Sequence, residues 1–333
     1  MSVKLINMRS FLSVSEEFEE TTLSSTSDMQ MMTMTVEAVV AHELSKVYKN
    51  GVKALRNVMI SVKKGELFTI IGPNGAGKTT FLRVISTQLT PTKGDAEVLG
   101  YSVIKEPKMV RKHIAVVPQD VAAYGNYTPW DYAYYFAKLQ GLSSSESKRL
   151  ARKALEAVEL FELRNRVCNA LSGGEKKRAI IASALSSNAD VLMLDEPTSG
   201  LDAVARISVW SALREIVQEG KTILLTTHIM EEAEMISDRL AIIDQGIIIT
   251  CGNLKEIKQL VKERFKVVVR GKTDVIDSNY DVVKFGDKHI IYVKNEDEAS
   301  ELVRKLLKDD LSAEVAPVTL EDVFVKLVRS RNC

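Results

Sequence analysis

A glycine-rich segment constrains this chain more than any other feature of its sequence. It follows the apolar run Leu67–Ile71, precedes a stretch with helical spacing, and reads Gly72-Pro73-Asn74-Gly75-Ala76-Gly77-Lys78-Thr79. The segment fits the pattern GxxxxGK[ST], in which glycines let backbone N–H groups turn toward phosphate oxygens. The helix that follows points its positive N-terminus at the same anion. Strand, loop and helix in this order predict a phosphate-binding loop for a nucleotide.

Three side chains at the end of this loop suit a nucleoside triphosphate. Lys78 can reach the β- and γ-phosphates, and Thr79 offers a hydroxyl to Mg²⁺. Thr80 is expected to add a contact to the α-phosphate. The sequence thus predicts a nucleotide bound together with Mg²⁺.

A second apolar run ends in two acids. Val191–Leu194 reads as a buried strand, and Asp195 and Glu196 follow it directly. At a strand end, Asp195 can hold Mg²⁺ directly or through water, and Glu196 can orient and deprotonate an attacking water. Alone, the pair could equally be solvated acids at a strand end. Beside a phosphate-binding loop, it predicts hydrolysis.

The bulk composition excludes several classes of protein. Lys plus Arg (45) nearly balances Asp plus Glu (44), for a net charge of +1, which argues against a nucleic-acid partner. Cys168, Cys251 and Cys333 form neither a metal-binding nor a disulfide pattern, which favours a reducing cytosol. No apolar run has the length of a membrane span, and residues 1–14 lack the apolar core of a secretory signal.

The pattern of strands and helices predicts three parts. Residues 1–35 are rich in serine, methionine and acidic residues, so they are either a disordered leader or precede a later methionine start. Residues 36–260 alternate strand and helix signals, which is typical of an α/β domain, and a helical insertion is expected at about 120–187. After residue 262 the rhythm changes, and 262–333 are expected to form a small α+β domain.

Leu171-Ser172-Gly173-Gly174-Glu175 supplies the third motif, because a serine and two glycines at a helix N-terminus make another anion-binding site. The phosphate loop, this signature and the strand ending in Asp195-Glu196, in that order, resemble the ABC ATPase family over about residues 36–260. The resemblance implies a P-loop NTPase fold with a mixed sheet core, a helical subdomain and hydrolysis of ATP to ADP and phosphate. Glu175 departs from the glutamine that many members carry.

Smaller motifs extend the resemblance and assign roles that no single residue would indicate by itself. Tyr48 matches the ring that stacks on adenine, Gln119 the sensor of Mg²⁺ and the γ-phosphate, and His228 the switch histidine. Ser199-Gly200-Leu201-Asp202 matches the loop that crosses a dimer interface. The expected catalytic residues are Glu196 and His228, and the expected metal ligands are Thr79, Gln119 and Asp195. The expected ATP contacts are Tyr48, Gly72, Pro73, Asn74, Gly75, Ala76, Gly77, Lys78, Thr79, Thr80, Gln119, Ser172, Gly173, Gly174 and Asp202.

In this family, Ser172, Gly173 and Gly174 of a second subunit close over the γ-phosphate, so the partner is another copy of the chain or a paralogue. Residues 91–101, 110–114, 128–132 and 318–324 resemble the ATPase subunits of drug, polysaccharide and antibiotic exporters with separate permeases. The resemblance implies a cytoplasmic protein at the inner face of the cell membrane, with its permease contact between Gln119 and Leu142. Tyr124 and Tyr127 are the expected permease-facing residues. Two alternatives stay open: a soluble ABC ATPase with a cytosolic partner, and a nucleotide sensor with little turnover.

Overall fold

The computed structural model describes residues 36–123, 125–271, 280–308 and 311–331. The leader predicted at residues 1–35 and the permease-facing candidate Tyr124 lie outside these ranges.

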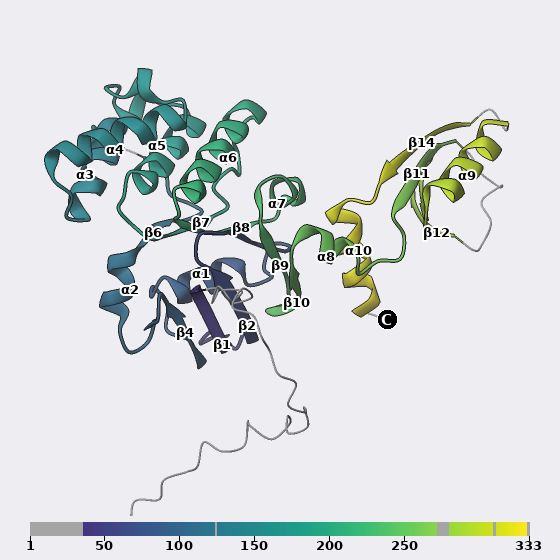
Figure 1. The fold of residues 1–333 in the computed structure, drawn as a ribbon, viewed down its shortest axis with the longest axis horizontal. Helices are drawn as coiled ribbons and strands as arrows, with labels where there is room; N and C mark the ends of the chain where they lie inside the picture. Colours follow the sequence, from purple (N-terminus) through teal and green to yellow (C-terminus); the bar gives the residue numbers. More distant parts are fainter. Residues whose placement is uncertain (1–35, 124, 272–279, 309–310, 332–333) are drawn as a thin grey trace, which may run out of the picture. The chain divides into compact units, whose positions relative to one another are not determined.

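A six-stranded sheet forms the centre of residues 36–260, the part expected to bind a nucleotide and therefore called the nucleotide-binding part (Figure 1). Its strands run parallel except for β10 at one edge. In spatial order they are β10 (Ile247–Gly252), β9 (Arg239–Asp244), β3 (Leu67–Ile71), β8 (Thr222–Thr227), β7 (Val191–Asp195) and β6 (Ile114–Val117). Every residue of β3, β7 and β8 is buried, as expected for parallel strands covered on both faces. The predicted α/β fold with a mixed sheet is confirmed.

A four-stranded antiparallel sheet packs beside the central one. Its order is β2 (Lys53–Lys63), β1 (Glu37–Val47), β4 (Lys93–Val98) and β5 (Tyr101–Ser102). Helix α1 (Lys78–Ile85) buries Phe81 and Ile85 in one cluster with residues of both sheets, among them Val39 and Ile70. The phosphate loop, which leads into α1, is therefore fixed between two sheets.

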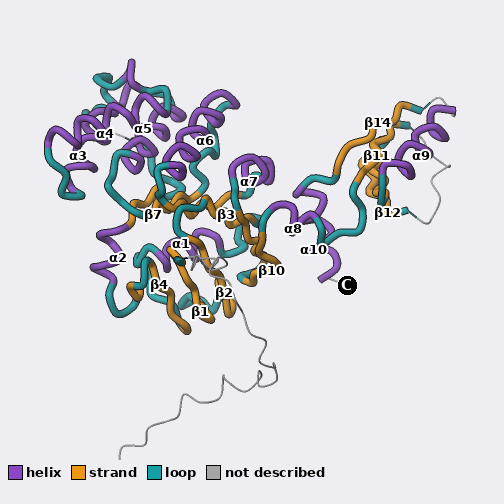
Figure 2. The backbone as a smooth tube through the Cα atoms, in the orientation of Figure 1, coloured by secondary structure: helices purple, strands orange, loops and turns teal. Residues whose placement is uncertain are grey.

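Helices α5 (Gly173–Leu185) and α6 (Ala203–Gln218) contact the other face of the central sheet, and α3 (Pro129–Leu139) and α4 (Ser144–Ala157) pack on these helices (Figure 2). Short 3₁₀ turns lie at Phe161–Leu163 and Cys168–Ala170. Capping boxes begin α3, α4 and α5, at Thr128, Ser143 and Ser172 respectively. Their apolar faces share a hydrophobic cluster with Leu192 and Leu225 of the sheet.

The C-terminal part contains a second four-stranded antiparallel sheet. Its order is β12 (Asp281–Phe285), β13 (Lys288–Val293), β11 (Phe265–Arg270) and β14 (Ser312–Pro317). Helix α9 (Glu296–Lys308) and this sheet enclose a hydrophobic cluster of their own. The last helix, α10 (Leu320–Arg331), packs differently: Leu320 and Val323 share a cluster with Ile71 and Leu240 of the central sheet. Helices α7 (Met230–Ile236) and α8 (Leu254–Lys258) also contact α10.

The structure contains elements that the sequence pattern did not indicate. They are β4, β5, β10, α2 (Pro107–His113) and α8. The helix expected after the phosphate loop ends at Ile85, because Ser86 closes it and Thr87 adopts a left-handed backbone with φ of 63°. The packing of α10 does not follow the division expected at residue 262, since this helix contributes to the core of the nucleotide-binding part.

Candidate functional site: a phosphate pocket

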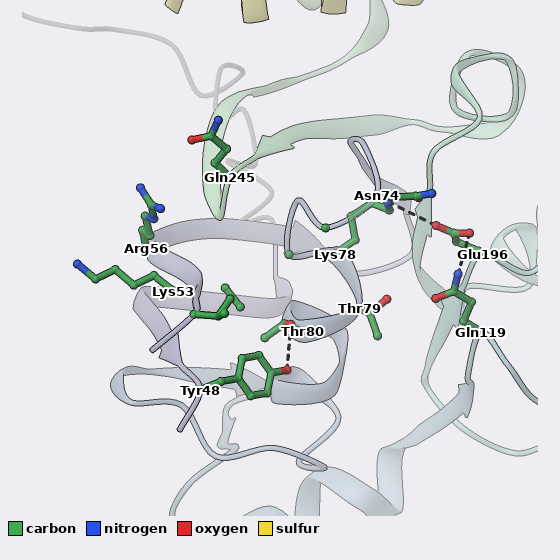
Figure 3. A pocket seen from close by; sticks show the side chains of 14 residues that line it. Tyr48, Lys53, Arg56, Asn74, Lys78, Thr79, Thr80, Gln119, Glu196 and Gln245 are labelled. Carbon is green, nitrogen blue, oxygen red and sulfur yellow. Dashed lines mark hydrogen bonds and ion pairs between the residues drawn. The ribbon is translucent and has the colours of Figure 1, made fainter. Parts of the chain in front are cut away.

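The phosphate loop lines a pocket of about 560 Å³ at the end of β3 (Figure 3). Close packing explains two of its three glycines, Gly72 and Gly77. Gly77 has φ of 110°, and a β-carbon there would lie 2.4 Å from the Ala54 carbonyl oxygen. A β-carbon on Gly72 would lie 2.1 Å from the Ile243 carbonyl oxygen. Neither position admits a side chain, so the loop keeps its backbone free to face an anion.

Lys78 is the first residue of α1, at the end of this loop, and is 5% exposed. Its Nζ donates to the carbonyl oxygens of Gly72 at 2.9 Å and Pro73 at 3.1 Å. Across the pocket, the same Nζ lies 3.4 Å from Oε1 of Glu196. A buried ammonium whose charged partner is a carboxylate across a pocket fits a polyphosphate, which can take the place of that carboxylate.

Glu196 gathers the residues expected to act on the γ-phosphate. Its Oε2 accepts a hydrogen bond from Nε2 of Gln119 at 3.1 Å. Nδ1 of His228 lies 3.0 Å from the same oxygen. The structure thus brings Lys78, Gln119 and His228, from three separate segments, around one carboxylate that is 4% exposed. A water in this place would meet a carboxylate base and cationic or amide donors together.

Asp195 lies one residue earlier and accepts a hydrogen bond from the hydroxyl of Thr226 on β8. It is 4% exposed. Within the described ranges, no three His, Cys, Asp or Glu side chains gather into a metal cage. In nucleotide sites, Mg²⁺ is typically held by one or two protein oxygens together with phosphates and water. Asp195 and the hydroxyl of Thr79 supply oxygens of this kind.

The other end of the pocket holds Tyr48. Its hydroxyl and that of Thr80 lie 3.1 Å apart, which ties the ring to helix α1. The expected α-phosphate contact of Thr80 would therefore share its hydroxyl with Tyr48. In Figure 3, Lys53, Arg56 and Gln245 lie on the side of the pocket opposite Glu196.

Comparisons with known proteins point to the same kind of site. A sequence profile of the family described as ABC transporter matches residues 55–199. The daunorubicin/doxorubicin resistance ATP-binding protein DrrA of Streptomyces peucetius is 37% identical over 228 residues, which cover 68% of this chain and 69% of the relative. The chain belongs to the ABC transporter family. It is an ATP-binding protein of that family, and its activity is the hydrolysis of ATP.

Solved ABC proteins share the fold of the nucleotide-binding part. One is an ATP-binding cassette described as a dimer in a post-hydrolysis state with ADP and Pi. It is 27% identical, with a TM-score of 0.60 over 65% of this chain and 98% of that chain. Another is CbiO1 of Clostridium perfringens, described as part of the transporter complex CbiONQ. It is 27% identical, with a TM-score of 0.59 over 68% of this chain and 94% of that chain.

The ABC signature lies apart from the pocket of its own chain. Ser172 and Gly173 are exposed and do not line it, nor does Asp202. Ser172 instead caps helix α5: its Oγ accepts from the Glu175 N–H at 3.3 Å. The Glu175 carboxylate accepts from the Ser172 N–H at 2.7 Å. The hydrogen bond from the Ser172 N–H is the largest of the causes that hold the pKa of Glu175 below its ordinary value; burial opposes it, and the Ser172 side chain and the nearby Arg166 and Arg178 add to the lowering.

Several residues of this ABC site were not predicted from the sequence. Lys53 and Arg56 line the pocket, and the feature that could have indicated them is their position just after the Asn50-Gly51 turn that follows Tyr48. Gln245 lies in the β9–β10 turn, which carries no motif. Lys177 on α5 was also missed, although its Nζ donates to the carbonyl oxygen of Glu196 at 2.8 Å.

Proposed function

We propose that this chain is the ATPase subunit of an ABC exporter whose membrane span is a separate permease. The observation that carries the proposal is the convergence of Lys78, Gln119 and His228 on the buried Glu196 carboxylate. The DrrA relative, itself named an ATP-binding protein for drug resistance, supports the exporter assignment because the match extends over 69% of its length.

In the proposed reaction, ATP displaces the Glu196 carboxylate from Lys78, whose ammonium then balances the β- and γ-phosphates. Glu196 takes a proton from the attacking water, and Gln119 and His228 hold the γ-phosphate and that water in line. Tyr48 stacks on the adenine. Asp195, Thr79 and Gln119 would hold Mg²⁺, which supplies positive charge to the phosphates.

The arrangement of the signature favours a second subunit. Ser172 and Gly173 present an exposed helix N-terminus, and Asp202 is exposed at the start of α6, but none of them lines the pocket of the same chain. A second copy or a paralogue can bring these groups over the γ-phosphate, so that two chains bury two ATP molecules about a two-fold axis. ATP then binds the closed pair better than the open one, and this difference in affinity moves the partner.

The surface of α3 fits a permease. Tyr127, Tyr135, Phe136 and Leu139 are exposed and line a hollow of about 510 Å³. Trp130, Tyr132 and Tyr134 pack against the core of the helices instead. An apolar surface of this kind, partly aromatic and rimmed by polar groups, suits a protein contact. This contact would place the protein at the inner face of the cell membrane. Among the described residues, no helix combines the length and apolar character that crossing a bilayer requires.

Co-purification from detergent-solubilised membranes tests the proposal. The tagged full chain should retain a polytopic membrane protein. Leu139→Glu, which places a charge at a side chain that is 83% exposed, should lose it. Met59→Glu changes a side chain that is 61% exposed on β2 and should retain it. Both variants should hydrolyse ATP as the wild type does. Recovery of a soluble protein alone, with no membrane protein, would favour an ABC ATPase with a cytosolic partner.

A further inference from the structure

Glu196 has an unfavourable backbone conformation. Its φ is 49°, in the left-handed region that residues with a β-carbon rarely adopt. Such a conformation persists only where the surrounding structure holds it, and it is concentrated at functional sites. The backbone of Glu196 therefore needs partners that fix it, and those partners determine where the carboxylate points.

Three contacts fix this backbone. The Glu196 N–H donates to the Thr226 carbonyl oxygen at 2.9 Å, and the Ser199 N–H donates to the Glu196 carbonyl oxygen at 3.3 Å. The third contact comes from a side chain: Nζ of Lys177 donates to the Glu196 carbonyl oxygen at 2.8 Å. The same Nζ donates to the Ser199 carbonyl oxygen, also at 2.8 Å.

Lys177 is half-buried in an acidic environment. Burial lowers the pKa of its ammonium, and the nearby carboxylates of Glu196, Glu232, Asp120 and Asp195 oppose that shift. Two hydrogen bonds to carbonyl oxygens therefore hold the Lys177 ammonium in place, in addition to the attraction of the nearby carboxylates. Its stem comes from the first turns of α5, the helix that Ser172 caps.

The same segment has a second anchor. The Glu232 carboxylate on α7, which is fully buried, accepts from the Thr198 hydroxyl at 2.7 Å and from the Trp210 Nε1 at 2.9 Å. Residues 196–199 are thus held by Glu232 through Thr198 and by Lys177 through the carbonyl oxygens of Glu196 and Ser199. Of these two charged residues, Lys177 is the one that bonds to Glu196 itself.

We propose that Lys177 is a positioning residue for ATP hydrolysis, which holds the Glu196 backbone so that the carboxylate faces Lys78, Gln119 and His228. The inference rests on the role of Glu196 given under the proposed function. It also follows that a displacement of the signature helix reaches Glu196 directly, through one side chain.

The variant Lys177→Met removes the ammonium and keeps the length of the stem. On the full chain, kcat for ATP hydrolysis should fall about 10²-fold, because a misplaced base loses the alignment that the reaction needs. KM and the affinity for a fluorescent ATP analogue should stay unchanged, since Lys78 and the phosphate loop are intact. Lys177→Arg, whose guanidinium can donate to both carbonyl oxygens, should recover part of the rate.

Lys221→Met is the matched control. Lys221 is also a half-buried lysine with its pKa lowered by burial, and its Nζ donates to the Ser187 carbonyl oxygen at 2.8 Å. Lys221 does not line the phosphate pocket. The melting temperature of Lys221→Met should therefore fall by about as much as that of Lys177→Met, while its kcat stays at the wild-type value. Equal loss of kcat in both variants, or a raised KM with unchanged kcat in Lys177→Met, would overturn the proposal. If Lys177→Met does not fold, Lys177→Gln takes its place and must show the same loss of kcat.

Glu196→Gln, measured beside these variants, separates the two hypotheses. If it hydrolyses ATP at the wild-type rate, the role of Glu196 is wrong and the positioning role falls with it. If it is inactive while Lys177→Met keeps the wild-type kcat, only the positioning role is wrong.

Discussion

The Lys78 ammonium lies 3.4 Å from a carboxylate oxygen of Glu196, so the proposed phosphate-binding residue and the proposed general base neutralise each other across the pocket. An incoming triphosphate is therefore expected to compete with Glu196 for Lys78. Under this proposal, the binding of the nucleotide is coupled to the release of the carboxylate that acts on it.

Lys78→Ala should abolish ATP binding or nearly so, because the phosphates lose the ammonium that balances their charge. Titration with a fluorescent ATP analogue measures this. Lys108→Ala removes an exposed lysine on α2 and should bind as the wild type does. Unchanged affinity in Lys78→Ala would remove the loop from the site.

Glu196→Gln keeps the shape of the side chain but cannot accept a proton, so hydrolysis should fall about 10²- to 10⁴-fold. ATP binding should become tighter, since the carboxylate no longer competes for Lys78. The closed pair should then accumulate as a dimer in ATP but not in ADP. Size-exclusion chromatography with light scattering measures this, and Glu301→Gln, an exposed change on α9, is the control. A variant that binds ATP yet stays monomeric would point to a paralogue as the partner.

Leu320→Ala should lower the stability of the nucleotide-binding part by about 2–5 kcal/mol, because the side chain is fully buried and its loss leaves a cavity. Its cluster contains Ile71 and Leu240, which belong to the central sheet. Leu307→Ala on α9 changes a leucine that is 57% exposed and should have little effect. Denaturant unfolding distinguishes them. Equal stability of Leu320→Ala and the wild type would mean that residues 36–260 fold without this helix.

Asp322 should make the packing of α10 sensitive to acid. Burial raises its pKa, but hydrogen bonds from Lys266, Thr319 and Tyr292 outweigh this effect and leave the pKa below its ordinary value. The folded state therefore binds the proton less readily than the unfolded one. The stabilisation is present above about pH 4 and is lost as the pH falls through the lower pKa of the folded protein.

Asp322→Asn, which removes this charge, tests that dependence. At neutral pH the variant should melt below the wild type, and the gap should narrow as the pH falls below about 4. Asp297→Asn, an exposed change on α9, should melt with the wild type at every pH. A gap that stays constant with pH would show that Asp322 acts without its charge.

The strands of the central sheet were predictable because each is a short apolar run between turns. The predicted bounds of β3 match the structure, and those of β7 differ by one residue, since a strand buried on both faces has no polar residue within it to obscure its ends. Strand β4 escaped prediction for the opposite reason. It reads Lys-Gly-Asp-Ala-Glu-Val, and only Ala96 and Val98 are buried.

The parts of the site that lie in motifs were predictable, and the links between motifs were not. The phosphate loop and the strand ending in Asp195-Glu196 can be recognised from consecutive residues alone. The bond from Lys177 to the Glu196 carbonyl oxygen joins residues 19 positions apart, and the lysine resembles any other on an amphipathic helix. Helix α10 likewise shows an apolar face in its sequence, but not the sheet on which that face packs.

The left-handed backbone at Glu196 has a consequence for how this position can evolve. A residue with a β-carbon there costs the fold about 1–2 kcal/mol, which glycine would recover and asparagine would lessen. Selection for stability alone would therefore favour these residues over the glutamate. Since Glu196 is the proposed general base, we expect glutamate to be kept at this position where hydrolysis is selected, and glycine or asparagine to replace it in related chains that no longer hydrolyse ATP.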